Sequence, residues 1–423
     1  MAKKQNEVKI CLWTHVQDEE HIIKDMLQSA VDYIDYWVLI DNGSKDSTPE
    51  IIEKFFKEHN VEGKLYHSEI GWKGHGVNRQ HSWDFLTSTN HGCDYILRID
   101  ADEKLVVEDN FNWSEIKEKE AWNVLYRTAN HCVRRLWLWD ASLPWFWKDD
   151  VAHETIHLPN DRTPNSGNLP DGLTHTNNPK QGQSYQNPIK YLQDVLKLEN
   201  QLLERFRDGA SLPEEEYHLT YLAKSFNYIG MNVEVENNWK YFPYGKANLE
   251  NFLRRGIFYW TQHLEQFGGN WYSYWQRAQL FVLLNDHSEA KQDWLTSYKK
   301  NPTRAEPIFN LFMHCFENQE WDEAYKYGNL LINIKCPYPQ DSYFVEFDKY
   351  HENNYRIADK LSIACHQFGM KYNIVDAVVF AKRLVNTAFS LHDIPNRDKS
   401  RMEDNIKYFD KSINKFTDEK EKE

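Results

Sequence analysis

The sequence predicts an α/β domain with a mostly parallel sheet, followed by an all-α domain of helical repeats. From residue 7 to about residue 158, short apolar runs alternate with amphipathic stretches, as strands alternate with helices in such sheets. Beyond Pro188 the apolar periods become long and helical, beginning with 191–206, and we expect no further strand. A chain of 423 residues has room for two or three domains with separate cores.

The first domain can be followed element by element. The expected strands are 8–13, 36–40, 64–67 and 95–99. The expected helices are 19–33, 78–88 and one that ends near Glu58, which a capping Ser47, a proline and an early acid begin. The strands that end at Trp13, Ile40 and Ile99 each run into a polar cluster. Because ligands bind at the carboxyl edge of open α/β sheets, we expect a site at this edge.

A polar segment separates the two domains. Residues 160–187 are rich in Asn, Gly, Pro, Gln and Thr and show almost no apolar periodicity, so we expect a long, flexible loop. We assign residues 1–205 to the first domain and residues 206–409 to the helical domain. Residues 410–423 form a charged tail that we expect to be frayed.

The helical part repeats with a period of 34 residues. One unit runs from Trp271 to Arg304, with Ala290 in its second half, and the next unit places Ala324 at the matching position. A small residue there lets two helices approach closely, and Pro302 ends the first unit. This is the tetratricopeptide period, and a looser third match contains Ala377. We expect the aromatic residues of these units to belong to the core; they are Trp271, Trp275, Trp294 and Trp321.

Composition excludes several classes of protein. An apolar content of 41% excludes general disorder, and 64 acidic against 50 basic residues argue against broad nucleic-acid binding. The absence of a long apolar window predicts no membrane span and no signal peptide. Six cysteines without a C-x-x-C pair predict reduced thiols and a cytoplasmic location.

Two acids follow the apolar run 95–99 directly. Asp100 and Asp102 leave this strand with only Ala101 between them, so both carboxylates can face one divalent cation. Hard oxygen ligands suit Mg²⁺ or Mn²⁺. Two acids at the end of a strand also occur in solvated turns and helix caps, so the pair alone is a weak signal.

Three segments together resemble the opening of the family-2 glycosyltransferases. They are Ile10 to Glu20, the D-x-G-S-x-D-x-T segment that begins at Asp41, and Ile99 to Glu103. The resemblance covers about residues 7–205 as a catalytic domain of the GT-A type. The helical remainder is similar to the tetratricopeptide extension of one branch of that family.

The resemblance implies a nucleoside diphosphate sugar donor, most often a UDP-sugar such as UDP-glucose, and a Mn²⁺ or Mg²⁺ cofactor. By the family's motifs, Glu19 would lie beside the nucleoside, Asp41 would accept a hydrogen bond from the base, and Arg79 would lie near the diphosphate or base. Asp100 would meet the ribose or the metal, and Asp102 would bind the metal directly. The alternatives are a turn-capping role for Asp41 and a surface helix charge for Arg79.

A base is also implied, because in an inverting transfer the acceptor hydroxyl loses its proton as it attacks. The segment from Val151 to Glu154 is similar to the V-H-E segment of the tetratricopeptide branch, so Glu154 is the expected base, with Asp149 and Asp150 in reserve. It follows an aromatic stretch, 143–147, that could form a wall for a sugar ring. His175 fits the position of a metal-binding loop histidine, and His153 is the competing ligand. Glu154 as a helix-terminal acid and His153 as a packed ring are the alternatives.

The leading hypothesis is thus a metal-dependent, inverting glycosyltransferase. The branch usually has Lys-Asn where this chain has Gln17-Asp18, which puts the donor contacts in doubt, and the missing Q-x-x-R-W motif favours transfer of a single sugar. The acceptor stays open among saccharides, lipid-linked sugars, protein side chains and modified nucleobases; the helical domain would bind it or mediate self-association. The alternatives are a tetratricopeptide scaffold with an inactive nucleotide-binding domain, and a nucleotidyltransferase. The first predicts a missing metal acid, and the second a basic phosphate loop where Thr14 to Glu20 is acidic.

Overall fold

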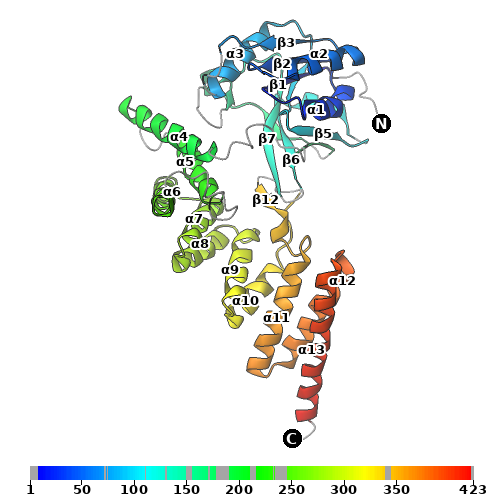
Figure 1. Ribbon diagram of the computed structural model, residues 1–423, viewed down its shortest axis with the longest axis vertical. Helices are drawn as coiled ribbons and strands as arrows, with labels where there is room; N and C mark the ends of the chain where they lie inside the picture. The colour runs from blue at the N-terminus through cyan, green and yellow to red at the C-terminus, as the bar shows by residue number, and fades with distance from the viewer. Residues whose placement is uncertain are drawn as a thin grey trace. The chain divides into compact units, whose positions relative to one another are not determined.

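The protein forms two compact units in the computed structural model (Figure 1). One unit is Met1–Gly245 with Ser342–Phe344, and the other is Lys246–Asp341 with Val345–Glu423. Helices α4 (Lys190–Arg207) and α5 (Glu216–Gly230) therefore group with the first unit, whereas the sequence places a boundary after residue 205. The structure describes residues 8–70, 73, 75–109, 111–128, 131–148, 155–169, 172–177, 190–209, 216–231, 233, 245–338 and 344–420.

A mixed sheet forms the centre of the first unit. Eight of its strands lie in the order β3-β2-β1-β4-β7-β6-β11-β5, and β10 pairs with β6. The bounds are β1 Ile10–Val16, β2 Tyr36–Asp41, β3 Gly63–His67, β4 Tyr95–Arg98, β5 Glu103–Val107, β6 Ala121–Arg127, β7 His131–Asp140, β10 Ser166–Asn168 and β11 Leu173–Asn177. Strands β3, β2, β1 and β4 are parallel, which confirms the prediction of parallel strands in this part of the sheet. Strand β7, in contrast, runs antiparallel to both its neighbours.

Helices follow the parallel strands as predicted. They are α1 (Ile23–Ala30) with the 3₁₀ turn η1 (Val31–Tyr33), α2 (Thr48–His59) and α3 (His75–Ser88). Pro49 stands in the first turn of α2, and Asn60 ends it in the left-handed region at φ 53°. Short elements complete the unit: the 3₁₀ turns η2 (Trp113–Glu118) and η3 (Pro159–Asp161), and the paired strands β8 (Phe146–Trp147) and β9 (Ile156–His157).

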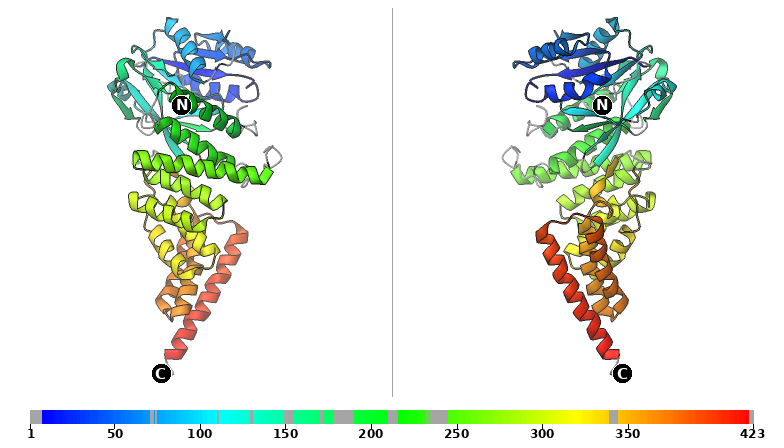
Figure 2. Two further views of the ribbon diagram at one scale, coloured as in Figure 1. Left: turned by 90° about the vertical axis from the view of Figure 1, so that its left-hand side faces the viewer. Right: turned by 90° about the vertical axis from the view of Figure 1, so that its right-hand side faces the viewer.

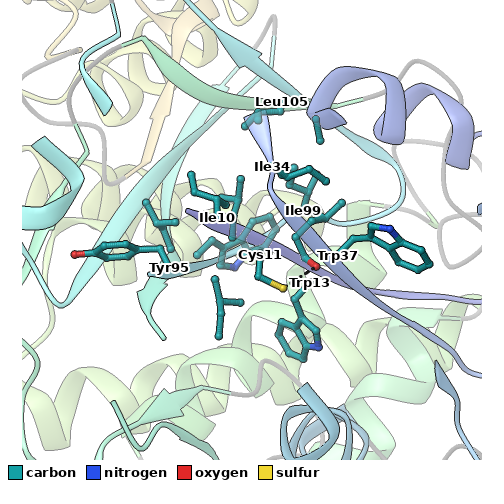
Figure 3. Close-up of a cluster of buried hydrophobic side chains, with 14 of the residues drawn as sticks. Ile10, Cys11, Trp13, Ile34, Trp37, Tyr95, Ile99 and Leu105 are labelled. Carbon is teal, nitrogen blue, oxygen red and sulfur yellow. Dashed lines mark hydrogen bonds between the residues drawn. The ribbon is translucent and has the colours of Figure 1, made fainter. Parts of the chain in front are cut away.

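The core of this unit lies around β1, which is buried on both faces as parallel strands covered by helices are. Figure 3 shows Ile10, Cys11 and Trp13 of β1 together with Tyr95 and Ile99. The continuous apolar run in the sequence therefore reflects burial of both faces.

Two expectations about loops and ends are wrong. The segment expected as a loop contains β10 and β11, and β11 lies between β6 and β5 inside the sheet. Residues 170, 171 and 178–187 of that segment lie outside the described residues. The expected frayed tail continues helix α13 (Asn396–Lys420), which buries Phe409 and Phe416. Phe409 and Phe416 are about two helical turns apart, so both lie on the same face of α13.

The second unit is helical and contains the predicted repeats. Its elements are α6 (Gly245–Phe267), α7 (Trp271–Leu283), α8 (His287–Lys300), α9 (Glu306–Glu317), α10 (Trp321–Leu331), β12 (Phe344–Glu346), the 3₁₀ turn η8 (Phe347–Lys349), α11 (Tyr355–Tyr372), α12 (Val375–Leu391) and α13. Figure 2 shows the hairpins stacked in succession from α7 to α12. The short strand β12 contradicts the expectation that no strand follows Pro188.

Small residues lie where the helices of each hairpin approach. Ala290 and Ala324 are fully buried, and Ala377 is nearly so, as the repeat predicts. Trp275 and Trp294 belong to the core, while Trp271 and Trp321 are half-buried. Within the described residues, no helix is both long and apolar enough to cross a bilayer.

Candidate donor site at the sheet edge

Three parallel strands bring their carboxyl ends together at one edge. Val16 pairs with Asp41, and Asp41 pairs with His67 on the other side. Strand β4 lies on the far side of β1 and ends at Arg98, two residues before Asp100. The polar clusters after β1, β2 and β4 therefore meet at the edge where the sequence predicts a site.

The segment that follows β2 is fastened to the segment that follows β1. The backbone N–H of Asp18 donates to Oγ of Ser44 over 3.0 Å, and the N–H of Lys45 donates back to Oδ1 of Asp18 over 2.7 Å. The N–H of Glu19 donates to Oγ1 of Thr48 over 2.8 Å. Short oxygen-bearing side chains at these positions satisfy backbone groups that neither strand nor helix can pair. This explains physically why the Asp41 motif carries Ser, Asp and Thr at fixed spacing.

Asp41 is buried and held on both sides. Its Oδ1 accepts from the N–H of Ser44 over 2.9 Å, and its Oδ2 lies 3.0 Å from Nδ1 of His67. Gly43, which lies between Asp41 and Ser44 in the sequence, has a φ of 92° that makes the tight turn possible. The sequence predicts the position of Asp41 but assigns no role to His67, although that residue ends a predicted strand.

His15 is a second residue that the sequence left unassigned. Its Nε2 lies 2.7 Å from Oγ of Ser82, and its Nδ1 lies 3.3 Å from Nδ2 of Asn42. The imidazole therefore joins the end of β1 to α3 and to the turn after β2. Its position next to the last residue of β1 is the signal that could have pointed to it.

Asp100 is bound by the arginine two residues before it. Nε and Nη2 of Arg98 donate to Oδ1 of Asp100 over 3.1 and 2.9 Å. Partial burial raises the pKa of Asp100, but Arg98, Arg79 and Arg135 outweigh it and hold this pKa well below its usual range. Asp100 is therefore a fixed carboxylate surrounded by guanidinium groups.

Arg79, on α3, interacts electrostatically with Asp100. Its charge is among those that lower the pKa of Asp100, and its guanidinium lies 5.4 Å from the ring centroid of Trp147. Oε1 of Gln80, the next residue on α3, accepts from the N–H of Trp147 over 2.6 Å. These contacts fix α3 against strand β8.

Trp147 does not form the open sugar-binding wall that the aromatic stretch 143–147 predicts. It is buried in a cluster of four indoles, and its ring lies 5.7 Å from Trp13 and 5.9 Å from Trp139. Trp83 of α3 completes the cluster, 5.3 Å from Trp13. These rings form the core behind the edge of the sheet, because the burial of large aromatic side chains contributes strongly to the stability of the fold.

His175 lies in a strand rather than in a mobile loop. It belongs to β11, where it pairs with Leu105 of β5 and Tyr126 of β6, and it is buried. Its Nδ1 lies 3.4 Å from Oε2 of Glu103, whose other oxygen accepts from Nη1 of Arg135 over 2.6 Å. Its ring lies 5.3 Å from that of Trp137. The structure thus brings His175 to the acid that follows Asp102.

A shared tryptophan connects this group to Asp100. The guanidinium groups of Arg98 and Arg135 each lie 4.5 Å from the ring centroid of Trp137. Glu103 and Asp100 raise the pKa of Arg135 and outweigh its burial. Carboxylates and guanidinium groups therefore alternate behind the edge of the sheet.

A divalent cation needs several oxygen or nitrogen ligands at one place. Among the residues that the structure describes, no three His, Cys, Asp or Glu side chains are grouped so that they could hold a metal ion. Mg²⁺ is commonly held by one or two carboxylates together with substrate phosphates, and Asp102, half-buried in the turn after β4, offers one such carboxylate. The donor chemistry therefore fits a cation that arrives with a diphosphate. His153, Glu154, Asp149 and Asp150 lie outside the described residues.

Comparisons with known proteins agree with this architecture. Residues 14–108 match the model of glycosyl transferase family 2. A TPR repeat-containing protein of Synechococcus elongatus is 29% identical over 118 residues, which are 27% of this chain and 24% of that protein. The match thus spans about a quarter of the length of the curated relative.

Two solved structures are similar at low scores. The crystal structure of S. aureus TarS 1-349 has a TM-score of 0.33 at 13% identity and covers 70% of this chain and 92% of that one. The crystal structure of MamA has a TM-score of 0.32 at 12% identity, over 50% and 99% of the two chains. The family match spans β2, which ends at Asp41, and β4, which ends two residues before Asp100. Residues 14–108 are a glycosyl transferase family 2 domain, and a tetratricopeptide-like helical region follows it.

Proposed function

We propose that the protein is an inverting glycosyltransferase that moves one sugar from a UDP-sugar, such as UDP-glucose, to an acceptor hydroxyl. One observation carries the proposal: within the family-2 match, the buried Asp41 ends β2 and the arginine-bound Asp100 follows β4, and these two strands lie on either side of β1. A nucleoside diphosphate offers N–H groups and hydroxyls to the carboxylates, and its negative phosphates suit the guanidinium groups beside Asp100.

The donor would lie across the strand ends. Asp41 accepts a hydrogen bond from the base, and Glu19, nearly buried in the loop after β1, lies beside the nucleoside. Asp100 takes the ribose, and Arg79 faces the diphosphate, which is supported by its electrostatic contact with Asp100. The fixed carboxylate orientations lower the entropy that binding would otherwise cost.

Asp102 would hold Mn²⁺ or Mg²⁺ together with the diphosphate. Asp100 and His175 are the further candidate ligands, with His153 as the alternative histidine. When bound, the cation would neutralise the charge of the departing nucleoside diphosphate. The ion pair between Asp100 and Arg98 favours a ribose or outer role for Asp100, since its Oδ1 already accepts two hydrogen bonds.

Glu154 would serve as the base. As the acceptor oxygen forms its bond to the anomeric carbon, the bond from that carbon to the diphosphate oxygen breaks, and the hydroxyl proton passes to the carboxylate of Glu154. Asp149 and Asp150 are the alternative bases. Attack from the face opposite the diphosphate inverts the anomeric configuration.

The helical region would bind the acceptor or mediate self-association. Stacked helical hairpins present extended surfaces to other molecules, and they support a saccharide, lipid-linked or protein acceptor equally. All six cysteines are free thiols, which supports a reducing, cytoplasmic location.

Calorimetric titration with UDP tests the proposal without knowledge of the acceptor. UDP is expected to bind in the presence of Mn²⁺ and to bind at least about tenfold more weakly without it or in Asp102→Ala, a loss of roughly 1.4 kcal/mol. GDP serves as the control for the identity of the nucleobase. Asp376→Ala, at an exposed position of α12, is the matched acid control and should bind like the unchanged protein.

Two results would overturn this assignment. If neither nucleotide binds in the presence of metal, the donor site is wrong and an inactive scaffold becomes the better description. If UDP binds equally with and without Mn²⁺, and equally in Asp102→Ala, the metal role is wrong while the nucleotide site stands.

A further inference from the structure

The imidazole of His15 lies between two segments of the proposed donor site. Its Nε2 lies 2.7 Å from Oγ of Ser82 on α3, and its Nδ1 lies 3.3 Å from Nδ2 of Asn42, the residue after Asp41. The hydroxyl of Ser82 in turn donates to the backbone carbonyl of Arg79 over 2.9 Å. Two hydrogen bonds therefore connect His15 to the backbone of Arg79, and one connects it to the turn that follows Asp41.

These partners fix the position of the proton on the imidazole. The hydroxyl of Ser82 has one proton and donates it to the carbonyl of Arg79, so its oxygen accepts from Nε2 of His15. The amide nitrogen of Asn42 can only donate, so Nδ1 of His15 accepts from it. His15 is thus a neutral imidazole with its proton on Nε2, and each nitrogen binds a different segment of the chain.

Aromatic packing holds the same ring in place. The imidazole lies edge-on to the indole of Trp13, with 5.3 Å between the ring centroids, and Trp13 packs against Trp83 of α3 at the same distance. Trp13 and Ser82 are buried, and His15 is half-buried. Because the imidazole is a rigid ring, a shift of α3 along β1 would break its bond to Ser82 or its bond to Asn42.

The two segments that His15 joins would bind opposite ends of the donor. Asp41 is the proposed partner of the nucleobase, and Arg79, which interacts electrostatically with Asp100, is the proposed partner of the diphosphate. If the spacing of these two groups is set before the donor arrives, binding does not have to restrict it.

We propose that His15 is a positioning residue of the donor site, which sets the spacing between the turn after Asp41 and Arg79 so that one nucleoside diphosphate can bind both. This role rests on the donor site proposed above. His15 acts through Ser82 and Asn42 and needs no contact with the donor itself. Loss of its bond to Ser82 should therefore weaken UDP binding only where Arg79 is present to be positioned.

A double-mutant cycle, measured on the full-length protein by titration calorimetry with UDP and Mn²⁺, tests the connection through Ser82. Ser82→Ala removes the oxygen that accepts from His15 and should weaken UDP binding about fivefold, as expected for the loss of one hydrogen bond. In the Arg79→Met background, where the guanidinium is absent, the same substitution should change the affinity less than about twofold. Equal fold-losses in both backgrounds would mean that Ser82 does not act through Arg79, and would overturn the proposal.

Ser88 provides a matched control on the same helix. Its hydroxyl donates to the carbonyl of Phe85 over 2.7 Å, three residues earlier, as that of Ser82 does to Arg79, but Ser88 is exposed to solvent. Ser88→Ala should therefore bind UDP like the unchanged protein. A loss equal to that in Ser82→Ala would show that removal of any such hydroxyl from α3 weakens binding, and the bond to His15 would not be the cause.

Two substitutions of His15 separate positioning from packing. His15→Phe keeps a ring against Trp13 but loses both hydrogen bonds, whereas His15→Gln loses the ring but can donate an amide N–H to Ser82. Positioning predicts that His15→Phe weakens UDP binding about fivefold or more and that His15→Gln restores most of this loss. The opposite order would show that the ring acts by packing alone, and would overturn the proposal. If either variant loses its fold by circular dichroism, the cycle of Ser82 and Arg79 decides.

Failure of the donor site itself gives a different result. If the unchanged protein does not bind UDP, or if Arg79→Met binds it equally well, the donor assignment is wrong and the role of His15 falls with it. If Arg79→Met weakens UDP binding while Ser82→Ala and His15→Phe do not, the donor site stands and only the role of His15 is wrong.

Discussion

Nδ1 of His67 lies 3.0 Å from Oδ2 of Asp41, and the two residues end adjacent parallel strands. The carboxylate is buried, with a side chain only 4% exposed, whereas the side chain of His67 is 64% exposed. The other oxygen of Asp41 accepts from the N–H of Ser44. The carboxylate is thus oriented by two partners before any ligand arrives.

The substitution Asp41→Asn therefore tests whether Asp41 recognises the nucleobase of the donor. The amide keeps the shape and can still accept from Ser44, but it loses the charge and cannot accept from both the base and His67. UDP affinity in the presence of Mn²⁺ is expected to fall about tenfold or more, as for a hydrogen bond to a charged group. Isothermal titration calorimetry measures the change.

His67→Gln serves as the comparison for Asp41→Asn. It removes the exposed imidazole while leaving Asp41 ionised, so its effect on UDP affinity should be smaller. Unchanged affinity in Asp41→Asn, with an unchanged melting temperature, would rule out a base contact by Asp41.

The ion pair between Arg98 and Asp100 predicts a pH-dependent contribution to stability. The pKa of Asp100 is lower in the folded protein than in the unfolded chain, so its ionised form stabilises the fold above about pH 4, and this contribution is lost as the pH falls below that value. Arg98→Met should therefore lower the melting temperature most near pH 7, and the difference from the unchanged protein should shrink towards pH 3. Differential scanning calorimetry across this range measures both melting temperatures.

Arg254→Met is the matched control for Arg98→Met. Arg254 pairs with Glu250 on the exposed surface of α6, and such pairs contribute little to stability. Its melting temperature should stay close to that of the unchanged protein at every pH. A constant, pH-independent loss in Arg98→Met would instead indicate that only the packing of Arg98 on Trp137 matters.

The sequence predicts those elements whose signal is local. The strand that ends at Asp41 and the strand before Asp100 are mostly apolar runs, and Ser47 with Pro49 marks the start of α2, so each could be found from neighbouring residues alone. Strand β11 could not, because Leu173 is its one large apolar residue and its place depends on pairing with β5 and β6. A loop was predicted there, and His175 was consequently placed in that loop.

In the candidate site, too, only the residues with a local signal could be predicted from the sequence. The positions of Asp41 and Asp100 follow from motif spacing, whereas their partners His67 and Arg135 come from other strands and only the sheet register brings them close. Long-range pairing is a property of the whole fold, so neither partner could be assigned from the residues around it.

Glu346 predicts a second pH effect, in the helical unit and of opposite sign. Burial raises the pKa of Glu346 to about 7, Lys349 opposes this, and Glu306 and Asp348 add to it. Because the folded pKa lies above the unfolded value, the folded state binds the extra proton and stability falls as the pH rises from about 4.5 to about 7. With partial exposure taken into account, Glu346→Gln should remove on the order of 2 kcal/mol of this dependence.

Urea unfolding of the full chain at pH 5.5 and pH 8 measures the effect of Glu346→Gln. Glu403→Gln, on the exposed side of α13, is the control and should keep the pH dependence of the unchanged protein. If both variants show the same dependence as the unchanged protein, Glu346 is ionised throughout and its burial is not costly.

The buried alanines of the repeats predict where the hairpins tolerate no added volume. Ala290 and Ala324 are 0% exposed, and each lies on the second helix of a hairpin, against the first. Because a well-packed interface cannot take three further carbon atoms without moving the helices, Ala290→Leu and Ala324→Leu should each destabilise the protein by about 1–3 kcal/mol. Glu289→Leu, at the exposed position beside Ala290, adds a leucine of the same size without filling the interface and should change the unfolding midpoint in urea little. Equal midpoints for Ala290→Leu and Glu289→Leu would mean that the α7–α8 interface has room to spare, and the requirement for a small residue at this position of the repeat would be wrong.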